Sequence, residues 1–232
     1  MIVSVHLADV GRLNAQRLLL RGLDASRVPG MSYSEVVFAA KLGSRSANRI
    51  PRPQPGRIGL IAAWEDDDAL DSFLAEHPFA ARLAGGWHTR LEPLRCFGTW
   101  AGMSGLPERE LPVQGDEPVA ALTLGRLRLT RTPAFLRSAL PAERDAAEDP
   151  AVLAVTGFGR FTPPRLVSTF SIWRSADAMR RYAFDKSGSH QAAVKVDRAH
   201  PFHSESAFIR FRPYASRGNW DGRNPLGAVE TR

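Results

Sequence analysis

The sequence contains a single cysteine, Cys96, among its 232 residues. One cysteine excludes an intrachain disulfide and metal sites built from clustered cysteines. Cys96 lies in the alternating run LRCFGTW, which predicts an unreactive cysteine in a strand. No apolar run reaches the roughly 18 residues that a membrane-spanning helix needs. The opening stretch MIVSVHLADVGRLN lacks the basic start and unbroken apolar core of a signal peptide, so we expect a cytoplasmic protein.

Several catalytic motifs are also missing. The sequence has no Gly-x-Ser-x-Gly nucleophile turn, no P-loop, no dinucleotide-binding fingerprint and no His-Glu-x-x-His pattern. The stretches GRLRLTR and GFGRF are too short or wrongly placed to hold a phosphate group. These absences disfavour a hydrolase or a kinase. They also mean that an oxidoreductase reaction needs an external electron donor.

Positive charge is abundant, but it is not clustered. The net charge is +7, carried mostly by arginines, and no run of five basic residues occurs. This scatter is unlike a nucleic-acid-binding segment, so we expect no nucleic acid as a partner. Attraction to anionic lipid at a membrane surface, or to an anionic cofactor, suits the charge better.

The chain contains an internal repeat, because residues 58–102 and 166–222 follow the same order of landmarks. Each copy starts with an apolar strand pattern that ends in tryptophan, followed by a helix start that carries acidic residues. His-x-x-Ala with a basic and an aliphatic residue comes next, and each copy closes on Gly-x-Trp-x-Gly. The corresponding residues are Trp64 and Trp173, His77 and His190, and the closing turns 98–102 and 218–222.

The segments ahead of the two copies correspond as well, so each half predicts the order β-α-β-β-α-β. In the second half, Ser175 is a predicted helix N-cap, and Ala176, Met179 and Ala183 share one helix face. We predict an α+β fold of two tandem ferredoxin-like modules, packed sheet to sheet as a dimeric-α/β-barrel-type fold. A cavity between the two sheets is the expected ligand site. The predicted modules span residues 1–103 and 117–214, with a linker at 104–116 and a polar tail at 215–232.

Histidine is the residue type with the clearest chemical potential. His190 shares a helix face with Ala193 and Val194, which suits either a structural side chain or a metal ligand. Together with His200 and His203 it could form a three-histidine site for zinc or non-haem iron. Against that site, the HPFH stretch lies in a turn before a strand, and Glu205 is the one carboxylate nearby. The choice among these three histidines stays open.

Several stretches of the chain resemble the spheroidene monooxygenase family. They are VPGMSYSEVVFAAKLGSR, IGLIAAW, TFSIWRSADAMRRYAF, GSHQAAV and HPFHSESAFIRFRPYASRGNWDGRNP. The resemblance spans essentially the whole chain and implies the architecture of an α+β-barrel haem protein. It also implies a monooxygenase that uses haem b, takes electrons from an external donor and oxidises a small hydrophobic substrate.

The resemblance implies site residues too. The family's Gly-x-His falls on Gly188–His190, which makes His190 the expected ligand of the haem iron. A Lys-Leu pair before a glycine-rich turn places Lys41, Gly43, Ser44 and Arg45 at the cofactor, with Lys41 and Arg45 expected at the haem propionates. Arg210 on the last strand matches as well. His77 is the expected structural copy of His190, and no catalytic residue is identified.

The sequence also departs from the family pattern. Ser189 stands where we expect proline, and the loop GSRSANRIPRPQP is rich in arginine rather than in small residues. These differences weaken the implied carotenoid specificity more than the implied fold. Two other functions stay open, a non-catalytic haem- or small-ligand-binding protein and a cofactor-free α+β-barrel oxygenase. The sequence does not indicate the oligomeric state.

Overall fold

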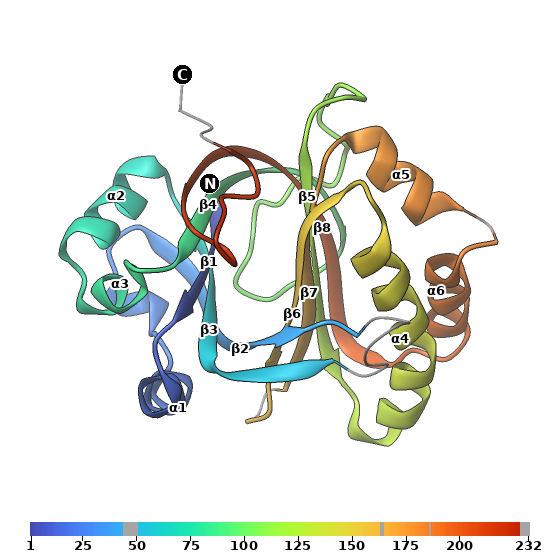
Figure 1. Ribbon diagram of the computed structural model, residues 1–232, viewed down its shortest axis with the longest axis horizontal. Helices are drawn as coiled ribbons and strands as arrows, with labels where there is room; N and C mark the ends of the chain where they lie inside the picture. Colours follow the sequence, from blue (N-terminus) through green and yellow to red (C-terminus); the bar gives the residue numbers. More distant parts are fainter. Residues whose placement is uncertain (44–50, 163–164, 186, 228–232) are drawn as a thin grey trace.

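In the computed structural model, which describes residues 1–43, 51–162, 165–185 and 187–227, the strands close into one barrel (Figure 1). The strand order is β1-β3-β2-β6-β7-β5-β8-β4. The first half contains β1 (Ile2–Asp9), α1 (Arg12–Arg21), η1 (Ala25–Arg27), β2 (Met31–Lys41), β3 (Arg52–Trp64), α2 (Asp67–Glu76), α3 (Pro78–Leu83) and β4 (Trp87–Gly98). The second half contains β5 (Val119–Leu127), η2 (Leu129–Arg131), α4 (Thr132–Glu148), β6 (Val152–Arg160), β7 (Leu166–Trp173), α5 (Ala176–Phe184), α6 (Ser189–Ala199) and β8 (His203–Gly218).

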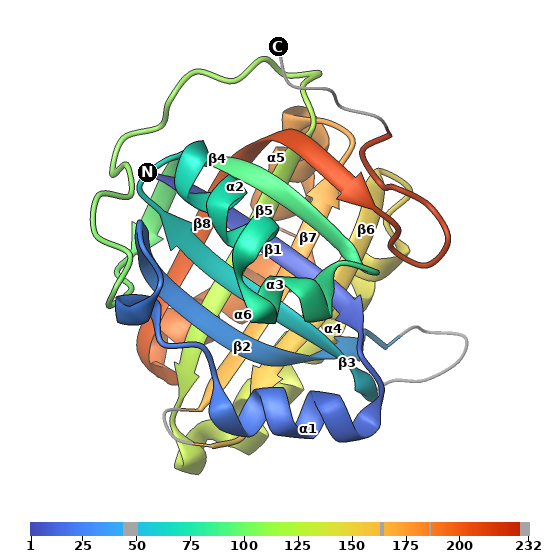
Figure 2. The same ribbon diagram turned by 90° about the vertical axis from the view of Figure 1, so that its left-hand side faces the viewer.

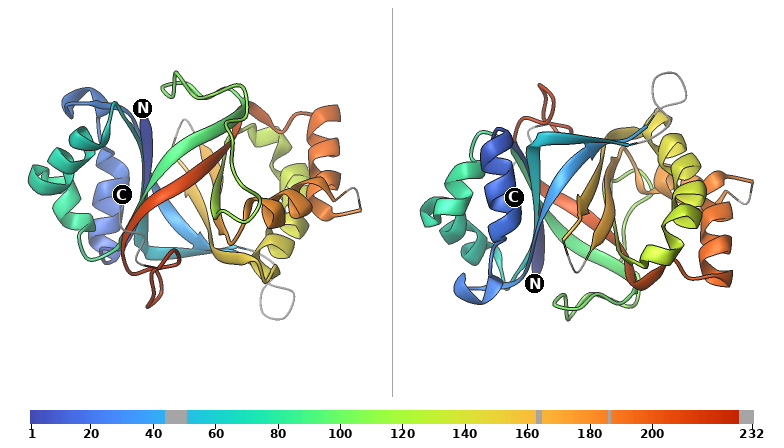
Figure 3. Two further views of the ribbon diagram at one scale, coloured as in Figure 1. Left: turned by 90° about the horizontal axis from the view of Figure 1, so that it is seen from above. Right: turned by 90° about the horizontal axis from the view of Figure 1, so that it is seen from below.

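The two halves have the same antiparallel strand order, β4-β1-β3-β2 and β8-β5-β7-β6. Pairing of β2 with β6 and of β4 with β8 joins them into the barrel. Helices α1 to α3 lie on one side of the barrel and α4 to α6 on the other (Figures 2 and 3). The predicted fold of two tandem ferredoxin-like modules in a dimeric-α/β-barrel-type arrangement is therefore confirmed.

Local capping explains where the helices that follow β3 and β7 begin. Asp66 caps α2 by accepting a hydrogen bond from the backbone N–H of Ala69 at 2.9 Å. Ser175 caps α5 by accepting one from Ala178 at 3.2 Å, as predicted. The predicted face of α5 is buried, because Met179 is 1% exposed. These caps determine where both helices start, shortly after the tryptophans that end β3 and β7.

The barrel interior is lined mostly by apolar side chains, and it also holds the buried carboxylate of Glu35, which pairs with Arg126 and Arg160. Both Gly-x-Trp-x-Gly turns contribute to the apolar lining. Gly98 and Gly218 have φ of 85° and 83°, a conformation that glycine adopts without a Cβ penalty. Each turn folds its tryptophan, Trp100 or Trp220, into the interior cluster. Because β4 and β8 are antiparallel, the two tryptophans enter from opposite ends of the barrel.

The ends of β4 and β8 differ in detail from the sequence-based boundaries. Strand β8 continues to Gly218 and still pairs with β4 there, so residues 215–218 belong to the sheet rather than to the tail.

Cys96 lies in β4 and is half-buried, and burial raises the pKa of its thiol. This position agrees with the predicted unreactive strand cysteine. Among the described residues, no helix is both long and apolar enough to cross a membrane.

Candidate functional site

The outer face of the second sheet, on the side of α4 and α6, is incompletely covered. Thr123 lies in the middle of β5 and is exposed, although β7 and β8 flank it. Thr169 pairs with it across β7 and is half-buried, as are Val167 and Ser171 on the same face. An exposed side chain in mid-sheet means that the helices above do not pack against it. We call the region formed by Thr123, Val167, Thr169 and Ser171 the sheet slot.

The same face of the first sheet is closed. Trp64 pairs with Ile2 and Trp173 pairs with Val119, so these pairs align the two halves residue by residue. Under this alignment the sheet slot corresponds to residues that are at most 2% exposed, namely His6, Ile58, Leu60 and Ala62. Leu60 in the first half thus stands where the second half has Thr169. The short side chains of the sheet slot, most of them hydroxyl-bearing, leave space on the outer face of the second sheet. Larger side chains such as His6 and Leu60 fill the corresponding space on the first sheet.

The helices near the sheet slot are also loosely packed. No residue of α6 is buried, and α4 buries only Ala142 and Ala146. Ala193 and Val194, the apolar face of α6, are half-buried. A helix with one apolar face normally buries that face against the layer below it. The apolar side of α6 therefore lacks a complete partner in this part of the structure.

His190 lies in the first turn of α6. Its Nδ1 is 3.2 Å from the carbonyl oxygen of Ala183 at the end of α5. A carbonyl only accepts hydrogen bonds, so this contact places the ring hydrogen on Nδ1 and leaves the Nε2 lone pair available. Burial lowers the pKa of His190, and the Ala183 contact offsets only part of that effect. The imidazole is thus neutral near pH 7 with one nitrogen free to bind a metal.

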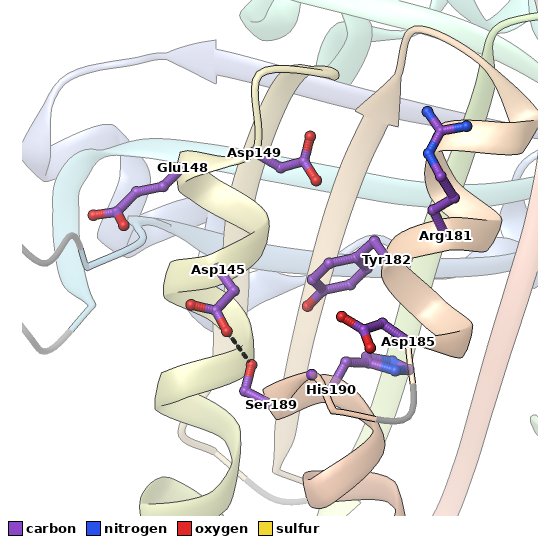
Figure 4. A pocket seen from close by; sticks show the side chains of 9 residues that line it. Asp145, Glu148, Asp149, Arg181, Tyr182, Asp185, Ser189 and His190 are labelled. Atoms are coloured by element: carbon purple, nitrogen blue, oxygen red, sulfur yellow. Dashed lines mark hydrogen bonds between the residues drawn. The ribbon is translucent and has the colours of Figure 1, made fainter.

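A pocket of about 480 Å³ lies beside His190, between the C-terminal end of α4, α5 and the start of α6 (Figure 4). Tyr182 lies across it, with its ring centre 5.2 Å from that of His190. Ser189 donates a hydrogen bond to Asp145 and so ties α6 to α4. The remaining lining is mostly acidic: Glu148, Asp149 and Asp185, with Arg181 and Gly188. This side of the site suits a cation rather than an anion.

Glu143 is a buried acid that sequence reasoning missed. It lies on α4 between Ala142 and Ala146, both buried, and its Oε2 is buried without a hydrogen-bond partner among the described residues. Burial raises the pKa of Glu143 to about 7. Burial, and after it the nearby carboxylates including Glu143, raise the pKa of Tyr182, whose hydroxyl donates to Ala142 O at 2.8 Å. The signal in the sequence was one acid within an alanine-rich helix face.

The raised pKa of Glu143 predicts a specific pH dependence of stability. Between its ordinary value of 4.5 and about 7, the unfolded chain ionises Glu143 while the folded chain keeps it protonated. The free energy of unfolding should therefore fall as pH rises through this window, by roughly 3 kcal/mol in total. We expect Glu143→Gln to remove this fall. Urea unfolding at pH 5 and pH 8 measures it.

The matched control is Glu108→Gln, which changes an exposed glutamate. Titration of the remaining groups, including the buried His6 and His88, is common to all three proteins and cancels when their pH dependences are compared. If wild type and Glu143→Gln show the same change between pH 5 and pH 8, Glu143 is not a buried acid with a raised pKa.

The structure brings only some of the predicted site residues to the sheet slot. Arg210 lies on the same outer sheet face, since Ala121 pairs with Arg210 and Thr123 with Phe208. It is 2% exposed and forms an ion pair with Glu110, so it already has an anionic partner. Lys41 ends β2 beside β6 and is exposed, and Gly43 is buried. Ser44 and Arg45 lie outside the described residues.

The three histidines considered for a metal site do not come together. His190 and His200 lie at opposite ends of α6, which at 1.5 Å per residue puts them about 15 Å apart. His203 starts β8, where it contacts Phe135 and lies 3.6 Å from Asp197. Among the described residues, no group of three or more histidine, cysteine or acidic side chains could hold a metal ion.

Two features of this region suit a haem. His190 is neutral with its Nδ1 held by Ala183, and the sheet slot has short side chains on the side of α4 and α6. The acidic pocket lining does not suit propionates. Arg210, on the same sheet face as the slot, is already paired with Glu110 and would hold a propionate only by exchanging that partner.

Comparisons with known proteins bear on the family and the fold of the chain. No family model matches the chain. Spheroidene monooxygenase from Rubrivivax gelatinosus is 30% identical over 86% of this chain and 77% of its own length. The enzyme of the same name from Rhodobacter capsulatus is 28% identical over 88% of this chain and 86% of its own. The one from Cereibacter sphaeroides is 27% identical, over 93% and 68%. These relatives support a monooxygenase.

Solved structures of two aldoxime dehydratases share the fold. One matches with a TM-score of 0.57 over 99% of this chain and 88% of its own, at 11% identity. The other, solved in complex with butyraldoxime, matches with a TM-score of 0.55 over 100% and 86%, at 10% identity. At such low identity the likeness concerns the fold alone.

Proposed function

The chain belongs to the spheroidene monooxygenase family, and we propose that it is a haem-dependent monooxygenase that oxidises a small hydrophobic molecule. The observation that carries the haem part of this proposal is the neutral imidazole of His190 on α6, a helix that buries no residue and lies on the side of a sheet whose counterpart in the first half is closed. A purely structural histidine would not require an open sheet face on that side. Family membership supports the monooxygenase part.

In this proposal His190 binds the haem iron through Nε2, and the Ala183 carbonyl fixes the ring by accepting a hydrogen bond from Nδ1. When bound there, haem would supply the redox chemistry that oxygenation needs. The short side chains of the sheet slot provide a flat wall, while Phe208, opposite Thr123 on β8, adds apolar surface. Of the cations that the resemblance implies, Lys41 is exposed at the end of β2, and Arg210 would have to leave Glu110 to reach a propionate.

Glu143 is a described group that could hold a proton near Tyr182, which lines the His190 pocket. Its Oε2 is buried on the inner face of α4, and a pKa of about 7 lets it release or take up a proton near neutrality. Monooxygenation consumes two protons and two electrons, because RH + O₂ + 2 H⁺ + 2 e⁻ gives ROH + H₂O. The electrons come from a separate reduced one-electron carrier, since the sequence has no recognisable flavin or nicotinamide motif.

We propose only the class of the substrate, which is a hydrophobic small molecule. Spheroidene-type carotenoids are the first candidates, because the relatives are named for spheroidene. Ser189 and the arginine-rich loop depart from the family pattern beside the expected haem contacts. A screen of hydrophobic substrates should therefore extend beyond carotenoids.

Labelled dioxygen tests the proposed reaction. The haem-loaded chain, supplied with a reduced one-electron carrier and spheroidene, is expected to place one atom from ¹⁸O₂ in each product hydroxyl and none from labelled water. Protein without haem serves as the control and should give no product. Equal turnover without haem would contradict the proposal and favour a cofactor-free oxygenase, and label from water would exclude oxygenation.

A further inference from the structure

Three segments of the chain lie at one end of the molecule, on both sides of the barrel (Figures 1 and 3). Helix α1, the end of β6 and the start of α4 with η2 all lie at the lower end of the barrel in two perpendicular views (Figures 1 and 2). They come from different parts of the sequence and from both halves. We call this end, defined by residues 10–23, 126–142 and 157–162, the arginine–leucine face.

Large apolar side chains are exposed on the arginine–leucine face. On α1, Leu13 is 72% and Leu20 is 78% exposed, and their seven-residue spacing places them on one side of the helix. Phe161, directly after β6, is 72% exposed. Leu129 and Leu136 at η2 and α4 are 59% and 42% exposed. Single exposed leucines are ordinary, but five large apolar side chains at one end of a molecule mark an interaction surface.

The charged side chains within these three segments are all cationic. Residues 10–23, 126–142 and 157–162 contain no aspartate or glutamate. Arg17 lies on the same side of α1 as Leu13 and Leu20, because it is four residues after one and three before the other. The exposed arginines of the face are Arg12, Arg17, Arg21, Arg128, Arg131 and Arg137. Cations therefore alternate with apolar side chains in these three segments, and the acids from other segments that reach them, Glu35 and Glu205, are paired with Arg126, Glu35 also with Arg160.

We propose that the arginine–leucine face docks on the surface of an anionic lipid bilayer. Exposed leucine and phenylalanine side chains enter the boundary between headgroups and acyl chains, and the arginines contact anionic headgroups. Nucleic acid would use the arginines but leave the leucines in water, which makes lipid the better match. The inference does not depend on haem.

Vesicle co-sedimentation of the full chain tests this inference. We expect binding to phosphatidylcholine vesicles that contain phosphatidylglycerol, and little binding to phosphatidylcholine alone. Leu13→Ser with Leu20→Ser should lower the affinity at least tenfold, or about 1.4 kcal/mol, because two apolar anchors are lost. Arg17→Gln with Arg131→Gln should lower it by about 25-fold, since each cation near the surface contributes about fivefold.

Two variants serve as matched controls. Leu111→Ser changes an exposed leucine outside the face, and Arg82→Gln removes an exposed cation on α3. Both should keep wild-type affinity, apart from the small effect of net charge. The proposal is overturned if the wild type binds no vesicles, if it binds neutral and anionic vesicles equally, or if the double leucine variant binds as the wild type does. Tighter binding to duplex DNA, unaffected by the leucine changes, would overturn it in favour of nucleic acid.

Discussion

Replacing His190 with alanine is expected to abolish the visible spectrum of a histidine-ligated haem in this protein. The imidazole Nε2 is the proposed iron ligand, and Nδ1 is already held by the Ala183 carbonyl. Loss of a group that merely orients a ligand costs 10- to 100-fold in metal affinity, so loss of the ligand itself should cost at least about 100-fold. Haemin titration followed by absorption measures the effect, and added imidazole should restore part of the spectrum.

The first half of the chain supplies a matched control for this experiment. His77 occupies the corresponding place in the repeat, where its Nδ1 accepts a hydrogen bond from the backbone N–H of Phe79 at 3.1 Å and caps α3. His77→Ala should lower the free energy of unfolding by about 1 kcal/mol and leave haem binding unchanged. If His190→Ala keeps the wild-type spectrum, the iron ligand is another residue and the sheet slot is not the haem site.

Filling the sheet slot is the second change with a large expected effect. Thr123→Leu with Thr169→Leu introduces larger side chains, one of them the residue that the first half has at the corresponding position, Leu60. The added methylene and methyl groups would occupy the space proposed for the porphyrin, so haem affinity should fall at least about 100-fold, near 3 kcal/mol. Without haem, the free energy of unfolding should stay equal or rise by about 1 kcal/mol.

Opposite changes in affinity and stability distinguish a filled site from a damaged fold. Thr99→Leu makes the same type of substitution at an exposed position outside the slot and should change neither quantity. Wild-type haem affinity in the doubly substituted protein would show that the porphyrin does not lie against this sheet face. Lower stability together with lower affinity would indicate unfolding rather than exclusion.

The fold could be predicted because its signals are local and occur twice. Trp64 and Trp173 end equivalent strands, and Gly98 and Gly218 adopt nearly equal positive φ values before the two inward-folded tryptophans. Each of these features depends on a short stretch of sequence. The repeat then determined the element order of both halves, and the ferredoxin-like topology followed from that order.

The site could be predicted only in part, because its defining features depend on distant segments. The openness at Thr123 results from how far α4 and α6 lie from the sheet, which strand alternation does not reveal. Arg210 matched the family pattern, but its partner Glu110 comes from the connection between the halves. Glu143 differs from an ordinary helix glutamate only by its burial. The expected cavity between the sheets stays a prediction; Trp100 and Trp220 occupy part of that space, which strand alternation did not indicate.

The most direct test of the proposed site is titration of the wild-type chain, prepared without haem, with haemin while its visible absorption is recorded. Binding at the sheet slot predicts saturation at one haem per chain, with a spectrum characteristic of histidine ligation that is lost in His190→Ala. A chain that shows no saturable change in its spectrum, or that binds haem equally well with the slot filled, would contradict a haem site on the outer face of the second sheet.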